Sequence, residues 1–173
     1  KYLIYGHFRK ALRLFQQSLQ LNKELKNKKG ISANIGNIGY LYSQWGYYDQ
    51  ALTYYNQSYK LAQETKDLFK QLSQLNNIGT IYKIKSQYQK ALSYFEKGLA
   101  LNKQLKDKKS QITLYHNIAM IYNDWGQFDR ALTYYEEALK LAQKYAMKNN
   151  IANIYNNIGQ VYRKKYRYRK AIK

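Results

Sequence analysis

The sequence predicts an all-α fold, a solenoid in which pairs of antiparallel helices stack one after another. A Tyr/Phe-x-x-Ala-Leu/Ile pattern recurs every 40 residues, at positions 8, 48, 88, 128 and 168. An Asn-Ile-Gly/Ala-x-x-Tyr pattern keeps the same step and begins at Asn37, Asn77, Asn117 and Asn157. A fixed period of this size is typical of repeat proteins, in which each repeat packs only on its neighbours. The complete absence of proline suits long helices joined by short turns.

Residues 32–45 are predicted to form the first helix of a complete repeat. Their apolar positions recur at spacings of three and four and so share one helix face: Ile35, Ile38, Leu41, Tyr42 and Trp45. Gly46 and its counterpart Gly126 suit the left-handed residue that closes a helix. Ser86 and Tyr166 replace glycine at the equivalent places, so we expect less ideal turns there.

Residues 48–65 are predicted to form the second helix, whose apolar face holds Tyr48, Ala51, Leu52, Tyr55, Tyr59 and Ala62. Asp49 lies in its first turn, where a negative charge complements the helix dipole. The small residues Gly39 and Ala51 allow the two helices to approach, and large tyrosines fill the space beside them. The aromatic stripe is therefore interpreted as core, rather than as a surface for a cofactor or for nucleic-acid bases.

The same reasoning extends along the chain. It predicts helices near 8–26, 32–45, 48–65, 71–85, 88–105, 111–125, 128–146 and 151–165, with another beginning at 168. The sequence is then a single array with a partial repeat at 1–30, complete repeats at 31–70, 71–110 and 111–150, and a partial repeat at 151–173. Because both ends fall within a repeat, we interpret it as a piece of a longer array. We also expect the apolar ends to favour head-to-tail self-association.

This pattern resembles the tetratricopeptide repeat family. The matching residues of one copy are Ile38, Gly39, Tyr42, Gly46, Tyr48, Ala51, Tyr55 and Ser58, and equivalent residues recur in the next two copies. The resemblance implies a right-handed superhelix whose concave groove binds another protein. The commonest family period is 34 residues, whereas the step of 40 resembles the subclass found in kinesin light chains, spindle-orientation adaptors and bacterial signalling proteins. The usual proline after the second helix is missing.

The formal net charge of +20 has two interpretations. It can mark a basic surface that attracts phosphate, acidic peptide or anionic lipid. It can also reflect a coding bias toward lysine, although such a bias does not explain why Asp and Glu total only 10. Half of the basic residues lie in three segments: Lys23, Lys26, Lys28 and Lys29; Lys103, Lys106, Lys108 and Lys109; and Arg163, Lys164, Lys165, Arg167, Arg169, Lys170 and Lys173.

Catalytic and metal-site signals are absent from the sequence. The two histidines, His7 and His116, have no nucleophile or carboxylate pair around them, and there is no cysteine. Gly36-x-x-Gly39 lies within a predicted helix and lacks the lysine of a phosphate-binding loop. We therefore expect no enzyme activity, no cofactor and no metal. No apolar run approaches the roughly 20 residues needed to span a membrane, and a cytoplasmic location is expected.

The recurring asparagines are the best candidates for a binding site. Asn37, Asn77, Asn117 and Asn157 each precede a packed isoleucine, so they point roughly 100° away from the core. A side-chain amide can bond both the N–H and the C=O of an extended peptide, and the resemblance implies this role. Alternatively, these residues bridge adjacent repeats internally. Other residues assigned to the same face are Tyr40, Asn76, Lys83, His116, Asn156 and Arg163.

Our leading interpretation is a protein-interaction scaffold that binds an extended or helical segment of another protein in this groove. One alternative is a basic solenoid that binds nucleic acid or another polyanion through the three lysine- and arginine-rich segments. The other is the regulatory arm of an enzyme encoded outside this sequence. Salt dependence separates the first two, because phosphate contacts weaken steeply as salt rises.

Overall fold

The computed structural model describes the backbone of residues 2–172 and the side chains of residues 7–167. Every element within this range is an α-helix, as the sequence predicts. In order they are α1 (Tyr2–Glu24), α2 (Lys28–Gln44), α3 (Tyr48–Glu64), α4 (Leu68–Ile84), α5 (Tyr88–Leu105), α6 (Lys108–Asp124), α7 (Phe128–Lys144) and α8 (Lys148–Ile172). The helices group into two compact units, unit 1 (Lys1–Lys85) and unit 2 (Ser86–Lys173).

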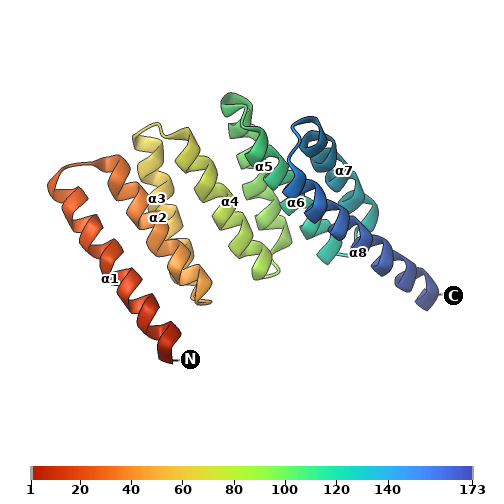
Figure 1. The fold of residues 1–173 in the computed structure, drawn as a ribbon, viewed down its shortest axis with the longest axis horizontal. Helices are drawn as coiled ribbons and strands as arrows, with labels where there is room; N and C mark the ends of the chain where they lie inside the picture. Colours follow the sequence, from red (N-terminus) through yellow and green to blue (C-terminus); the bar gives the residue numbers. More distant parts are fainter. Residues whose placement is uncertain (1, 173) are drawn as a thin grey trace. The chain divides into compact units, whose positions relative to one another are not determined.

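Unit 1 consists of α1 to α4, in which each helix packs against the next. Consecutive helices run in opposite directions, as the red-to-yellow part of Figure 1 shows. The first helix of one repeat, α2, also contacts the first helix of the following repeat, α4. The two therefore lie on the same side of α3, and residues at equivalent positions on them are neighbours.

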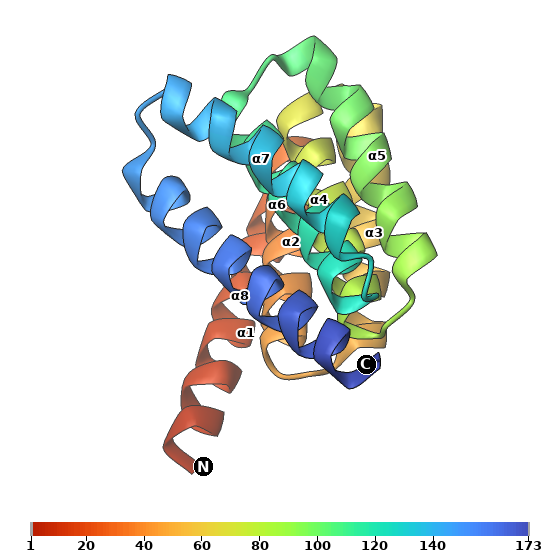
Figure 2. The ribbon, with the colours of Figure 1, turned by 90° about the vertical axis from the view of Figure 1, so that its right-hand side faces the viewer.

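Unit 2 repeats this arrangement with α5 to α8 (Figure 2). Each helix packs against the next, and α6 also contacts α8. Its core centres on α6 and α7, with Ile112, Ala131 and Tyr135 almost completely buried. From α8, Ile154 and Val161 complete this core.

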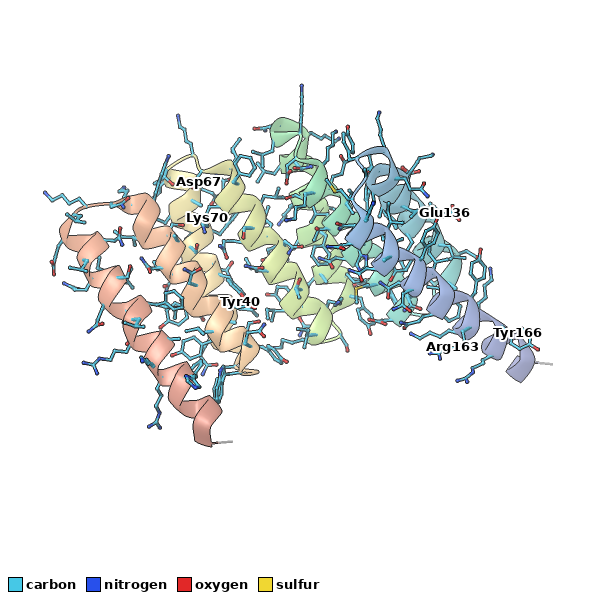
Figure 3. All side chains as sticks on the ribbon, in the orientation of Figure 1. Tyr40, Asp67, Lys70, Glu136, Arg163 and Tyr166 are labelled. Carbon is cyan, nitrogen blue, oxygen red and sulfur yellow. The ribbon has the colours of Figure 1, made fainter. Side chains whose placement is uncertain are left out.

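Three of the first helices begin earlier than predicted, because an asparagine or aspartate caps each N-terminus. Asn27 Oδ1 accepts a hydrogen bond from Gly30 N at 3.1 Å. Asp67 Oδ1 accepts one from Lys70 N at 2.9 Å, and both residues are labelled in Figure 3. In the same way, Asp107 Oδ2 accepts one from Ser110 N at 3.0 Å. These caps satisfy backbone donors that a helix start otherwise leaves open, so α2, α4 and α6 begin at residues 28, 68 and 108.

The turns within repeats follow the predicted glycine pattern. Gly46 and Gly126 take positive φ angles of 79° and 78°, in the left-handed region that glycine enters without steric cost. Ser86 adopts a similar conformation at φ 56° despite its side chain. The turns between repeats also use a left-handed residue, at Lys26, Lys66, Lys106 and Ala146.

One prediction about the turns is wrong. Helix α8 runs unbroken from Lys148 to Ile172, whereas the sequence pattern predicted a helix end near 165 and a new helix from 168. Tyr166 stands where Gly46 and Gly126 make the equivalent turns, so this place lacks the residue that enters the left-handed region without steric cost. The helix therefore continues.

Self-association is predicted through Tyr2, Leu3 and Phe8 at one end and Ile158, Tyr162 and Tyr168 at the other. Of these, Tyr2, Leu3 and Tyr168 lie outside the described side chains, and the Phe8 ring packs on Trp45 with 4.5 Å between the ring centroids. Self-association stays a prediction.

The predicted core is confirmed at its central positions. Ala51 and Ala131 are completely buried, and Tyr55, Phe95 and Tyr135 are at most 2% exposed. At Gly39, an added Cβ would lie 2.9 Å from Tyr55 Cδ1 and 3.1 Å from Tyr54 Cβ. The small residue therefore accommodates these two tyrosines, rather than facing Ala51 most closely as the sequence suggested.

Candidate functional site

Asn37 and Asn77 lie on α2 and α4, the two packed first helices of unit 1. Each precedes a buried isoleucine, Ile38 or Ile78, which fixes the direction of the neighbouring amide. The side chain of Asn37 is exposed, and its amide makes no hydrogen bond to a described residue. Asn77 is half-buried, and its Nδ2 donates to Gln74 Oε1 at 3.5 Å, the outer limit of hydrogen-bond distance. Unit 1 thus presents two amides from neighbouring helices, one of them fully available.

Asn157 has a partner on the neighbouring helix of unit 2. Its Nδ2 lies 3.2 Å from His116 Nε2, which joins α8 to α6. The His116 ring meets the ring of buried Tyr135 edge-on, with 5.5 Å between the ring centroids. Asn157 therefore makes the contact between repeats that the sequence left as an alternative to ligand binding. Asn117, on α6, is half-buried beside them.

The other residues assigned to this face differ in accessibility. Tyr40 on α2 is 55% exposed, and Arg163 on α8 is also exposed (Figure 3). Asn156 is exposed, whereas Asn76 and Lys83 are half-buried. Their contact with a ligand stays a prediction.

A buried polar contact joins α2 to α3 that the sequence analysis missed. Ser32 Oγ donates to the Ser58 backbone oxygen at 2.9 Å, and Ser58 Oγ donates to the Ser32 oxygen at 2.8 Å. Both serines are at most 2% exposed. Gly36 lies beside Ser58, because a Cβ added at Gly36 would lie 3.2 Å from Ser58 Oγ and 2.8 Å from Gln74 Nε2. Serine at 58, where the other complete repeats have Gly98 and Ala138, was the available signal.

Burial also changes the acid–base behaviour of the tyrosines below this face. Burial is the main cause that raises the pKa of Tyr55 to about 12. A hydrogen bond with Ser43 opposes this rise, and the nearby Tyr40 adds to it. Burial likewise raises the pKa of Tyr135. These tyrosines therefore remain neutral at physiological pH and act as packing groups.

The lysine- and arginine-rich segments differ in how far their charges are compensated. On α8, Lys165 pairs with Asp129, and Lys164 lies 3.8 Å from Asp124 Oδ1. The first lysine cluster occupies the α1–α2 turn, and the second occupies the α5–α6 turn. In the first, Lys28 Nζ pairs with Glu64 Oε2 at 3.1 Å. Part of the basic charge is therefore neutralised within the chain.

No group of three or more histidine, cysteine, aspartate or glutamate side chains among the described residues could hold a metal ion. Among the described helices, none combines the length and the apolar character needed to cross a membrane.

A family comparison agrees with the repeat geometry. The tetratricopeptide repeat matches residues 5–64, 71–144 and 110–173, which together cover most of the chain. The chain belongs to the tetratricopeptide repeat family. The resemblance carried by the 40-residue pattern is thereby confirmed, and this tetratricopeptide repeat chain has the fold of an interaction scaffold. No curated protein matched its sequence.

Several solved structures share the fold of this tetratricopeptide repeat chain. BtubC (BKLC) from P. vanneervenii is 21% identical with a TM-score of 0.77, and the match covers 91% of this chain and 66% of that one. The apo form of RapI is 15% identical with a TM-score of 0.82, covering 97% and 47%. The nearly identical repeats of a kinesin light chain from Podosopora anserina are 18% identical with a TM-score of 0.65, covering 92% and 82%. The chain thus spans only part of the first two proteins.

Proposed function

We propose that this tetratricopeptide array captures a peptide segment of another protein, with Asn37 and Asn77 holding the peptide backbone. The observation that carries the proposal is the exposed amide of Asn37, which recurs before a packed isoleucine in the later repeats. An amide offers a donor and an acceptor, so it can bond an extended backbone whatever the peptide sequence. Exposed side chains nearby, such as Tyr40, would then select among peptides.

The proposal assigns different roles to different members of the asparagine series. Asn37 has no competing bond within the described residues, and the bond of Asn77 to Gln74 is long. Asn157 instead bonds to His116 and holds α8 against α6. We therefore assign Asn37 and Asn77 to the ligand and Asn157 to the scaffold. Contact of Asn117 with a peptide stays a prediction.

The test begins with a peptide selected from a random display library against the immobilised chain. Asn37→Ala combined with Asn77→Ala should raise the Kd for this peptide about tenfold to a hundredfold, since each lost bond contributes about 0.5–1.5 kcal/mol. The melting temperature should hardly change. A peptide methylated at the bonded backbone nitrogen should bind the parent less well, yet bind the double variant no worse than the unmethylated peptide does.

Asn157→Ala is the matched control. Loss of its bond to His116 should lower the melting temperature while leaving the peptide affinity of the folded protein unchanged. A double Asn37/Asn77 variant that binds selected peptides normally would overturn the proposed role of the amides. Binding that disappears at moderate salt would instead favour the polyanion alternative. If the chain is instead the regulatory arm of an enzyme encoded outside this sequence, we expect the same peptide binding. This alternative differs only in the activity of the rest of the protein.

A further inference from the structure

An uncovered row of residues runs along α8. Its members lie alternately three and four residues apart and therefore share one helix face: Ala152, Tyr155, Gly159, Tyr162 and Tyr166. All five are exposed, and the three tyrosines are 53%, 55% and 65% exposed. Tyr166 is labelled in Figure 3. We call this row the α8 seam.

Helix α6 has the same seam one repeat earlier, and there a helix covers it. Tyr134 of α7 stacks on Tyr122 of α6 with 5.6 Å between the ring centroids, and it meets Tyr115 at 6.1 Å. Ala119, which lies between these two positions of α6, is completely buried. The seam of α6 therefore receives an aromatic side chain from the antiparallel helix α7.

On α8 no described residue takes the place of Tyr134. The rings of Tyr155 and Tyr162 make no aromatic contact with a described residue, and the Tyr155 hydroxyl accepts a hydrogen bond from Gln143 Nε2 at 3.1 Å. A Cβ added at Gly159 would have no neighbouring atom within 4 Å. The backbone remains helical through residues 168–172, so this segment does not fold back over the seam. The α8 seam thus offers the two tyrosines of α6 with the space between them open.

The charge of α8 indicates which kind of helix fits this space. None of its 25 residues is an aspartate or a glutamate. Lys164 and Lys165 already have carboxylate partners on α6 and α7. Arg163 and Arg167 are exposed and form no ion pair with a described residue. An acidic helix would therefore find two available guanidinium groups beside the seam.

The α6–α7 pair also shows which end of such a helix meets the arginines. The guanidinium of Arg130, in the first turn of α7, lies 5.6 Å from the ring centroid of Tyr122. Tyr162 is the equivalent of Tyr122, and Arg163 follows it directly. A helix that docks on α8 in the same way has its first turn beside Arg163 and Arg167. Acidic residues in that turn would pair with the arginines and complement the dipole of their own helix.

We propose that the α8 seam binds an amphipathic helix of a partner protein, with acidic residues in its first turn and an aromatic residue one turn later. The aromatic ring enters the space between Tyr155 and Tyr162, over Gly159, as Tyr134 does on α6. The acidic residues pair with the two free arginines. This surface lies on unit 2 and shares no residue with the proposed peptide contacts of Asn37 and Asn77.

The charges oppose a second copy of the chain as the occupant. Self-association is predicted to use Tyr162 of this seam at one end and Phe8 of α1 at the other. Beside Phe8, α1 carries Arg9, Lys10 and Arg13, and its only acidic residue is Glu24 near its other end. Pairing α1 with α8 would bring two basic helices together, and like charges across an interface oppose association. The seam is therefore better matched to a foreign acidic helix.

The first experiment uses a synthetic peptide as the probe. It has the α7 sequence, residues 128–144, with Arg130→Glu, so its first turn is acidic and Tyr134 is kept. The fluorescently labelled probe is titrated with the intact chain, and its anisotropy gives the Kd. A counterpart that keeps Arg130 and carries Asp129→Lys should bind about tenfold more weakly, because attraction becomes repulsion. Equal affinities of the two peptides would overturn the proposal, since charge would not select the helix.

Gly159→Leu separates docking from folding. The leucine fills the space between the two tyrosines and should raise the Kd about tenfold or more, while the protein keeps its stability because this glycine lies on an open helix surface. Arg163→Gln with Arg167→Gln should raise the Kd about threefold to tenfold and abolish the difference between the two peptides. Tyr145→Ala removes an exposed tyrosine outside the seam and is the matched control, with an unchanged Kd. Normal binding of the probe to Gly159→Leu would overturn the assignment to α8.

Further measurements address the other occupants. The chain alone should sediment as a monomer at the concentrations of the titration, and an oligomer that Gly159→Leu abolishes would overturn the proposal in favour of a second copy. Vesicles of phosphatidylserine should not displace the probe, and displacement would favour an anionic membrane surface instead. Asn37→Ala with Asn77→Ala should leave the Kd of the probe unchanged. A weaker Kd in that variant would place the probe in the groove of unit 1 and overturn this assignment, so the two proposals can fail separately.

Discussion

At the scale of single residues, the same repeat position has different requirements in different repeats. Gly39 and Gly159 are equivalent, yet a Cβ at Gly39 would lie 2.9 Å from Tyr55 Cδ1, whereas Gly159 has no such neighbour within 4 Å. Ala119 occupies this position on α6 and is completely buried. The α6–α7 pair therefore accommodates a methyl group at this position, whereas at Gly39 the ring of Tyr55 occupies that space.

We predict opposite effects from the same substitution at the two glycines. Gly39→Leu should overpack the α2–α3 contact and lower the free energy of unfolding by about 1–3 kcal/mol. Gly159→Leu should raise it by about 0.5–1 kcal/mol, because a good helix former replaces glycine on an open helix surface. Urea denaturation followed by circular dichroism measures both. Equal losses in the two variants would show that position within the repeat, rather than the neighbouring helix, sets the tolerance.

The buried Tyr55 predicts a loss of stability at alkaline pH. Its folded-state pKa of about 12 exceeds the unfolded value near 10, because burial disfavours the phenolate. Its contribution is therefore complete below pH 10 and is lost as the pH rises toward 12, where the unfolded chain releases a proton that the folded chain retains. Denaturation midpoints measured from pH 9 to 12 should fall less steeply in Tyr55→Phe than in the parent. Parallel curves would contradict the assignment.

At the scale of helices, apolar spacing predicted the order of the elements, but neither their first turns nor the continuation of α8 beyond residue 165. The predicted starts at 32, 71 and 111 lie three or four residues after the observed starts at 28, 68 and 108. The helices α2 and α6 each begin with two lysines, so their first turns give no apolar period to read. The signal that identifies them is the asparagine or aspartate three residues before the bonded backbone N–H, as at Asp67 and Lys70.

The cap of α4 gives a third prediction. Asp67→Ala removes the acceptor for Lys70 N and should lower the free energy of unfolding by about 0.5–2 kcal/mol. Asp67→Asn keeps a side-chain oxygen at the same place and should retain most of the stability. Thermal denaturation of the three proteins makes the comparison. If the asparagine variant loses as much as the alanine variant, then the charge of Asp67, rather than the cap bond, is what stabilises α4.

The candidate site shows why only part of it could be predicted. The asparagine series has a period, so its positions and its relation to the core follow from the sequence. His116 occurs at a position that holds Gly36, Asn76 and Asn156 in the other repeats, so periodicity gave no reason to pair it with Asn157. Residues that differ from one repeat to the next have no period, so their contacts could be identified only in the structure.

At the scale of the whole molecule, each unit contains the same internal contacts. Tyr42 and Tyr54 stack with 5.3 Å between ring centroids, and Tyr122 and Tyr134 stack at 5.6 Å. Each unit also has an ion pair between two successive repeats, Lys85 with Asp49 and Lys165 with Asp129. Because these contacts lie within a unit, each unit has its own set of stabilising interactions. In repeat proteins, stability is approximately a sum of such local terms.

The last prediction is that damage to one unit stays largely within it. Gly39→Leu should increase hydrogen exchange mainly in α2 and α3, whose contact it overpacks, and only slightly in α6 and α7. Replacing the buried Ala131 by leucine should give the reverse pattern, because that residue lies in the core of unit 2. Exchange measured by mass spectrometry at several urea concentrations resolves the helices, since local opening and global unfolding differ in free energy. If either substitution raises exchange equally in all of these helices, the two units unfold as one cooperative structure, and an effect of ligand binding in one unit would then be expected to reach the other.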